Sequence, residues 1–164
     1  MDNSEKKGLS RDLTSFIFKI LHNILPTKKR LFRMNMSNSP MCDLCDSNVE
    51  EDLPHALMDC DYNGVVNDWT LAVLFDIDPN LLSAETDSLN MVSLNIPMDP
   101  ETVLPVLWFL STVFSYIWKC RTRRKTVTLI QTRTTIEAEV NILKKTKFKQ
   151  SFELIESEIN FVIY

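Results

Sequence analysis

The sequence predicts an all-α protein, a small helical domain with a CCHC zinc knuckle. Only two glycines occur in 164 residues, which disfavours hairpin-rich β structure because tight hairpin turns need residues with positive φ. Apolar residues make up 45% of the chain and charged residues 24%, proportions typical of a folded domain with its own core. Three of the four cysteines and one of the two histidines lie between positions 42 and 60, a clustering that indicates a bound metal.

The first part of the chain is expected to form two helices. Residues 1–12 are interpreted as a flexible N-terminus without the apolar stretch of a signal peptide. From Leu13 to Ile24, apolar residues recur every three or four positions, which predicts an amphipathic helix that ends before Pro26. Thr27 is a candidate N-cap for a short basic helix over residues 28–34.

The residues Cys42, Cys45, His55 and Cys60 form the pattern C-x2-C-x9-H-x4-C. A C-x2-C turn lets two thiolates chelate one ion, and the x4 gap is expected to place His55 and Cys60 on one face of a helix, about one turn apart. The set suits tetrahedral Zn²⁺, with ligand atoms about 3 to 4 Å apart. Four ligands close the site to an activated water, so the zinc is expected to be structural. The alternative interpretation is a group of buried cysteines with a disulfide.

Around these ligands the chain carries the motifs Leu25-Pro26-Thr27, Arg30-Leu31 and Glu51-Asp52. Their order with Cys42, Cys45, His55 and Cys60 resembles the zinc-binding segment that follows the polymerase domain in non-LTR (LINE-type) retrotransposon reverse transcriptases. The resemblance covers residues 13–75, and the stretch from Trp118 to Arg124 is similar with less specificity. It implies a tail detached from the polymerase and endonuclease domains, and it implies handling of template or target nucleic acid.

Beyond the ligands, Val65 to Leu74 is expected to be a helix that completes a 13–78 segment, with Trp69 packed in the core. Residues 79–98 are interpreted as an irregular connector because Ser, Asn, Asp and Pro punctuate them. Residues 99–150 are expected to form a two-helix body, with helices over 103–118 and 127–143, and residues 151–164 a C-terminal helix or tail. The 103–118 run is shorter than the roughly 20 residues that span a bilayer, so we prefer a core helix to a membrane span.

Charge is segregated along the chain, although the net charge is only -4. The 41–118 block carries fourteen acidic residues and no Lys or Arg, whereas the segments before it and after it, 1–40 and 119–150, are basic. The candidate nucleic-acid contacts are Lys28, Lys29, Arg30, Arg33, Lys119, Arg121, Arg123, Arg124 and Lys125. If these residues share one face, they form a patch for a phosphate backbone with salt-dependent affinity. If they face the acidic block, they are structural.

The sequence therefore favours a non-catalytic zinc-binding domain that binds RNA or DNA through its basic helices. Because no paired-aspartate polymerase motif, nucleophile elbow or Walker loop occurs, no enzyme and no small-molecule substrate is expected. The alternative is a metal-stabilised protein–protein interaction scaffold, or a remnant without nucleic-acid binding. Cys120, expected to be a buried or inert thiol, lies outside the cluster. This usage of cysteine is typical of a reducing compartment, nuclear or cytoplasmic.

Overall fold

The computed structural model describes residues 10–82, 87–96 and 100–143, and its regular structure there is helical. The elements are α1 (Arg11–Leu21), α2 (Lys28–Arg33), a π-helical turn (His55–Asp59), a 3-10 turn (Asp61–Asn63), α3 (Gly64–Ile77), a second 3-10 turn (Pro79–Leu82), α4 (Ser88–Val92), α5 (Pro100–Thr122) and α6 (Leu129–Leu143). The described residues contain no strand, and an isolated bridge pairs Met41 with Glu50. The all-α prediction is confirmed.

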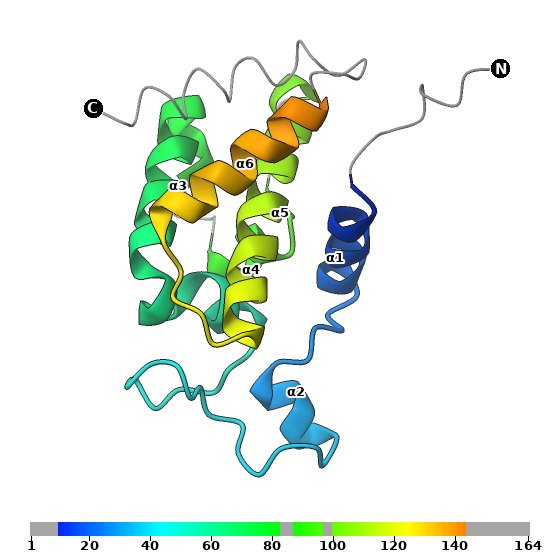
Figure 1. Ribbon diagram of the computed structural model, residues 1–164, viewed down its shortest axis with the longest axis vertical. Helices are drawn as coiled ribbons and strands as arrows, with labels where there is room; N and C mark the ends of the chain where they lie inside the picture. The colour runs from blue at the N-terminus through cyan, green and yellow to red at the C-terminus, as the bar shows by residue number, and fades with distance from the viewer. Residues whose placement is uncertain (1–9, 83–86, 97–99, 144–164) are drawn as a thin grey trace, which may run out of the picture.

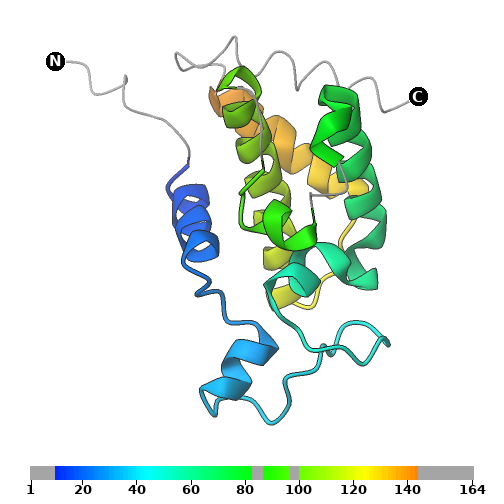
Figure 2. The same ribbon diagram turned by 180° about the vertical axis from the view of Figure 1, so that it is seen from behind.

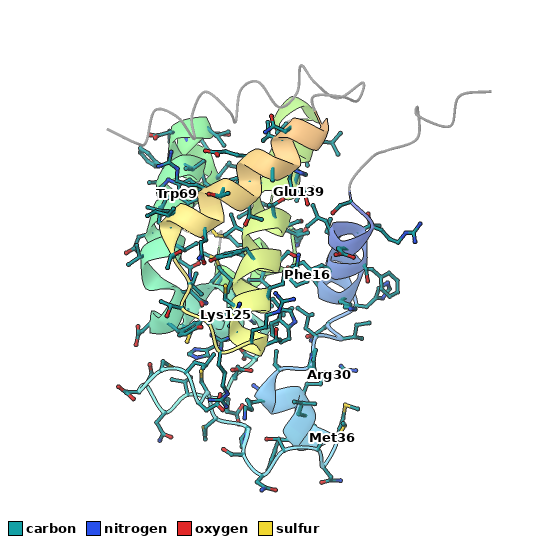
Figure 3. The ribbon with its side chains drawn as sticks, viewed as in Figure 1. Phe16, Arg30, Met36, Trp69, Lys125 and Glu139 are labelled. Atoms are coloured by element: carbon teal, nitrogen blue, oxygen red, sulfur yellow. The ribbon has the colours of Figure 1, made fainter. Side chains whose placement is uncertain are left out.

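The helix α5 lies in the middle of the fold, with α3 on one side of it and α1 on the other, while α6 crosses over α3 and α5 (Figures 1 and 2). Phe109 and Phe114 of α5 are fully buried, and the ring of Trp69 from α3 meets Phe109 edge-on at 5.8 Å between centroids. Buried residues of α1, α3, α5 and α6, among them Phe16 and Trp69 (Figure 3), belong to one hydrophobic cluster. The prediction that these four helices share a core is therefore confirmed.

Within α5, the stretch Val103–Thr122 is long and apolar enough to cross a membrane by length and composition alone. In this fold 67% of the most apolar 18-residue window of that stretch is buried against the rest of the protein, and every residue from 108 to 115 is buried. The run predicted over 103–118 is thus a core helix of the structure.

The first two helices begin at the caps that their sequences provide. The Ser10 side chain accepts a hydrogen bond from the Leu13 backbone N–H at 3.3 Å, so α1 begins slightly before the predicted start. It ends at Leu21 rather than at Ile24, and Asn23 turns the chain with a φ of 49°. Thr27 accepts from the Arg30 N–H at 3.3 Å, the N-cap that the sequence predicts for α2.

The connector expected over 79–98 is more regular than predicted. It contains the 3-10 turn and α4, which Asp87 caps by accepting a 2.7 Å hydrogen bond from the Asn90 N–H. Met91 and Val92 bury their side chains, so tertiary packing stabilises a helix too short to show a periodic pattern. The predicted tail over 151–164, and residues 1–9 of the predicted flexible N-terminus, lie outside the described residues.

Candidate metal centre

The four predicted zinc ligands lie close together in the structure. The ligand atoms of Cys42, Cys45, His55 and Cys60 all lie within 4.8 Å of one another. Two shorter separations are 3.8 Å, between Cys42 Sγ and Cys60 Sγ, and 3.5 Å, between Cys45 Sγ and His55 Nε2. Two sulfurs bound to one tetrahedral ion at about 2.3 Å lie about 3.8 Å apart. Although the widest separation exceeds the predicted range, the donor set fits Zn²⁺.

The four described cysteines are all free. The Cys42–Cys60 separation of 3.8 Å is far longer than the roughly 2.05 Å of a disulfide bond. The alternative interpretation of this cluster as a disulfide is therefore not what the structure contains. Cys120 is buried, as predicted, and lies outside the cluster.

The two thiols of the C-x2-C turn lie in a loop that backbone hydrogen bonds close. We call residues 41–60 the zinc loop. The Cys42 N–H donates to the Val49 carbonyl at 2.9 Å, and the Glu51 N–H donates to the Pro40 carbonyl at 2.9 Å. Within the turn, the Leu44 N–H donates a hydrogen bond to Cys42 Sγ at 3.5 Å. Backbone hydrogen bonds thus bring the Cys-containing turn to the second ligand pair.

The second ligand pair is presented by a π-helical turn, and here the predicted geometry was wrong. His55 and Cys60 are five positions apart, so in an α-helix their side chains would point about 140° away from each other. The chain instead forms a π turn over His55–Asp59, in which the repeat is wider. Cys60 follows it with extended backbone, at φ -82° and ψ 127°. Both ligands then reach the same point.

Two buried asparagines support this π turn. Asn63 Nδ2 donates to the Ala56 carbonyl at 2.9 Å, and Asn67 Nδ2 donates to the Met58 carbonyl at 2.5 Å. Their side chains satisfy carbonyls that a regular α-helical ladder would pair with backbone N–H groups. Sequence reasoning missed this role. The available signal was a pair of amides one helical turn apart, directly after the last ligand.

Cys45 and Cys60 differ in their acidity without a metal. Burial raises the pKa of Cys60 to about 11, so this thiol keeps its proton at neutral pH until a cation replaces it. Burial also opposes ionisation of Cys45, but hydrogen bonds from the hydroxyl and backbone N–H of Ser47 bring its pKa below the ordinary value. Zinc binding here would therefore release protons.

Arg121, from the end of α5, points into the thiol cluster. Its Nη2 lies 2.6 Å from Glu51 Oε2 and 3.4 Å from Cys42 Sγ, and its side chain is only 3% exposed. Although burial works against its charge, Cys60 and Glu51 raise the pKa of Arg121 above the ordinary value. The prediction of Arg121 as a surface contact for phosphate was wrong, because its guanidinium is not accessible.

The two predicted basic segments meet, but they meet over acidic side chains of the zinc loop. Asp43 Oδ2 lies 3.1 Å from Lys28 Nζ and 2.5 Å from Arg124 Nη2. Burial by itself would raise the pKa of Asp43, and the two cations hold that pKa below its ordinary value. Lys29 lies 2.8 Å from Glu50 and 3.5 Å from Asp52.

The other five predicted nucleic-acid contacts form no ion pair with the described residues. Arg30 Nη1 donates to the Asn23 carbonyl at 2.8 Å, beside a groove described below. The remaining four are exposed and form no ion pair with another residue of the described ranges; they are Arg33, Lys119, Arg123 and Lys125. The structure therefore does not join all nine residues into one open basic surface.

Comparison with known proteins places the cluster in a family segment. Residues 6–66 match a family model described as zinc-binding in reverse transcriptase. No curated protein and no solved structure matches the chain. The matched segment contains all four clustered residues and is a zinc-binding region rather than a catalytic polymerase region. Residues 6–66 are therefore similar to the zinc-binding segment of reverse transcriptases, as the sequence resemblance predicted, and this match together with the Cys/His cluster supports Zn²⁺ as the metal.

Proposed function

We propose that this chain is a non-catalytic, zinc-stabilised helical scaffold for protein contacts, with Zn²⁺ held by Cys42, Cys45, His55 and Cys60. The observation that carries this proposal is the pairing of its cations with acidic side chains of the zinc loop. Of the nine basic residues that suggested a nucleic-acid surface, Lys28, Lys29, Arg121 and Arg124 make ion pairs with the zinc loop. Its free thiols suit a reducing compartment, the nucleus or cytoplasm.

The first support is the charge balance of the metal centre. Three thiolates and a neutral imidazole around Zn²⁺ leave one net negative charge. Arg121 is the cation that faces these thiols from the core side, at 3.4 Å from Cys42 Sγ. A buried charge of one sign is costly unless a partner compensates it. Arg121 thus links the electrostatics of the zinc to the helix α5.

The second support is the position of Glu51 between three segments. Its Oε1 accepts a hydrogen bond from the Lys28 N–H at 3.0 Å, and its backbone carbonyl accepts from the Lys29 N–H at 3.1 Å. Its other carboxylate oxygen, Oε2, binds Arg121. The zinc loop, the start of α2 and the end of α5 are therefore joined through one buried carboxylate. A metal that orders the loop therefore also fixes how the loop is joined to the start of α2 and to the end of α5.

The third support is the chemistry between the ligands. Knuckles that clamp single-stranded RNA place aromatic and basic side chains between their ligands, where bases stack and phosphates bind. Here Asp43, Leu44 and Asp46 occupy the corresponding positions. Asp43 is also engaged by Lys28 and Arg124. The knuckle surface thus offers neither a stacking platform nor a free cation to a nucleic acid.

Nucleic-acid binding is the second candidate, and a specific observation favours it. Arg33, Lys119, Arg123 and Lys125 are exposed, and within the described ranges they form no ion pair. Lys119, Arg123 and Lys125 lie within one short stretch at and after the end of α5. Each phosphate that such cations neutralise adds salt-dependent affinity.

A combined metal and binding assay separates the two candidates. Elemental analysis of the purified protein should give about one zinc per chain, as a single four-ligand site requires. In fluorescence anisotropy with single-stranded RNA and duplex DNA, the scaffold proposal predicts no binding at low salt. Binding that falls steeply with salt, and that is lost in the folded triple variant Lys119→Glu/Arg123→Glu/Lys125→Glu but kept in a Lys19→Glu control, would instead establish the second candidate.

A further inference from the structure

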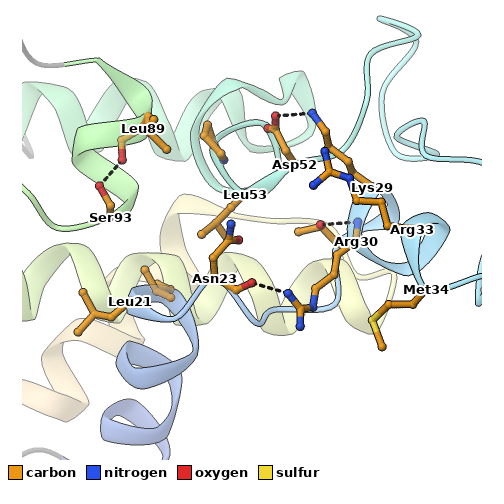
Figure 4. Close-up of a pocket in the computed structure, with 13 residues that line it drawn as sticks. Leu21, Asn23, Lys29, Arg30, Arg33, Met34, Asp52, Leu53, Leu89 and Ser93 are labelled. Atoms are coloured by element: carbon orange, nitrogen blue, oxygen red, sulfur yellow. Dashed lines mark hydrogen bonds and ion pairs between the residues drawn. The ribbon is translucent and has the colours of Figure 1, made fainter.

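A groove separates α2 and the end of α1 from α4 and the beginning of the π turn. Its volume is about 620 Å³, and Figure 4 shows the side chains that line it. Its two ends differ in chemistry. Leu21 and Leu89 lie at one end, while Arg30 and Arg33 lie at the other (Figure 4).

At the apolar end of the groove, hydrophobic side chains remain exposed to solvent. Leu21 is 58% exposed and Leu89 57% exposed, and both line the groove around the buried Leu53. Met34, 53% exposed, adds a flexible apolar side chain close to the arginines. Apolar side chains grouped around one hollow favour an apolar occupant.

At the basic end of the groove, only part of the positive charge is engaged in ion pairs. Lys29 is engaged by Glu50 and Asp52. Arg30 is held by the neutral Asn23 carbonyl and forms no ion pair with another described residue. Arg33 is exposed and forms no ion pair within the described ranges. The groove is thus complementary to an acidic, apolar surface.

The described part of the chain carries such a surface on α3. Val65, Asp68, Ala72, Phe75 and Asp76 fall within about 100° of one another around the helix, and all five are exposed. Val65 is 69% and Phe75 52% exposed. Because residues 41–118 contain no Lys or Arg, no cation from this part of the chain offsets the two aspartates. We call these five residues the α3 face.

We propose that the groove of one copy receives the α3 face of a second copy. Phe75 would contact Leu21 and Leu89, while Asp68, about 10 Å away along the helix, approaches Arg30 and Arg33. The inference rests on the proposed function, since it makes a second copy of this chain the partner that the scaffold binds.

The positions of the two surfaces set the type of assembly. The α3 helix and the α1–α2 side lie on opposite sides of α5 (Figures 1 and 2), so one copy cannot seat its α3 face in its own groove. A head-to-tail contact between different surfaces does not close by itself at two copies. A nucleic-acid occupant is less favoured, because none of the described residues lining the groove is aromatic and single strands use aromatic stacking platforms.

Charge reversal tests this contact with the protein as its own probe. Sedimentation of the zinc-loaded wild type, with a reducing agent present, should show mass that grows with protein concentration and decreases with added salt. Arg30→Glu/Arg33→Glu reverses the groove, and Asp68→Lys/Asp76→Lys reverses the α3 face. Each variant alone should associate at least roughly tenfold more weakly, because like charges then face each other. Mixing the two variants should restore association, because the groove and α3 face of different copies again have opposite charge.

Controls make the result decisive. Arg123→Glu/Lys125→Glu makes the same change of charge outside the groove and should leave association as in the wild type. A wild type that stays monomeric at every concentration, or folded variants that fail to associate when mixed, would overturn the inference. A monomer that still requires zinc for its folded loop would leave the zinc-scaffold proposal intact, so the two failures are distinguishable.

Discussion

The zinc loop and the helix α5 are stabilised by different physics. Between residues 41 and 50 only Cys42 is buried, whereas every residue from 108 to 115 is buried. The first half of the zinc loop therefore depends on ligands, hydrogen bonds and ion pairs, and the helix depends on apolar packing. In the second half, Leu53 and Leu57 belong to the hydrophobic core. Arg121 belongs to both regions, since α5 positions it and its guanidinium contacts Glu51 and Cys42 of the loop. The comparison teaches that loss of metal should unfold one region and spare the other.

Removal of a ligand should have the largest effect, and it should be confined to the loop. In Cys60→Ala we expect the zinc content to fall well below one per chain, because structural zinc contributes on the order of 10 kcal/mol to folding of such a site. The matched control is Cys120→Ala, a buried cysteine outside the cluster. Elemental analysis of both variants checks this, and equal zinc in the two would contradict the ligand assignment.

Truncation of a core aromatic residue should act on the helical body instead. Phe109 is fully buried, so Phe109→Ala should lower the free energy of unfolding by about 3–5 kcal/mol. The control Phe75→Ala removes a ring that is 52% exposed and should change that free energy by no more than about 0.5 kcal/mol. Chemical denaturation followed by tryptophan fluorescence measures both. Similar values would mean that α5 is not the core we describe.

Arg121 should connect the two regions, so its substitution should affect both readouts. In Arg121→Met we expect about 3 kcal/mol lower stability, because Glu51 stays buried without its partner. We also expect the zinc affinity to fall by roughly tenfold, since residues around metal ligands tune that affinity. Thermal unfolding and competition with a chelator report the two effects. Arg124→Met, at an exposed ion pair, is the control, and unchanged zinc affinity in Arg121→Met would show that Arg121 acts only in packing.

The smallest effect is expected from the exposed ion pairs of the zinc loop. Asp43 binds Lys28 and Arg124 at the surface, and exposed pairs contribute at most about 1 kcal/mol. We therefore expect Asp43→Asn to lower stability by less than about 1 kcal/mol at low salt, and by still less at high salt. Thermal unfolding at two salt concentrations measures this. A large loss that salt does not reduce would mean that Asp43 does more than pair with these cations.

Local patterns predicted much of this molecule. Apolar periodicity identified the four helices of the core, the Thr27 cap was correct, and the ligand spacing selected four residues that do cluster. These features depend on residues close in sequence. The π turn was missed because the x4 gap was interpreted with an α-helical repeat, which cannot bring His55 and Cys60 together.

The role of Arg121 depended on tertiary structure. Arg121 is 79 positions from Cys42, and nothing in its basic neighbourhood distinguishes it from the exposed Arg123. Whether Arg121 contacts phosphate or pairs with the buried Glu51 depends on the direction in which α5 ends. Sequence analysis could state that opposite charges alternate along the chain, but it could not state which cations turn inward.

Hydrogen exchange with and without zinc tests the central comparison most directly. After removal of zinc by a chelator, we predict that backbone amides of residues 41–50 and of α2 lose their protection, while those of α3 and the middle of α5 keep theirs. Restored zinc should restore the first set. Protection that is lost throughout α3 and α5 on chelation, or retained in residues 41–50, would contradict the account of one chain with a metal-held loop and an independently packed helical body.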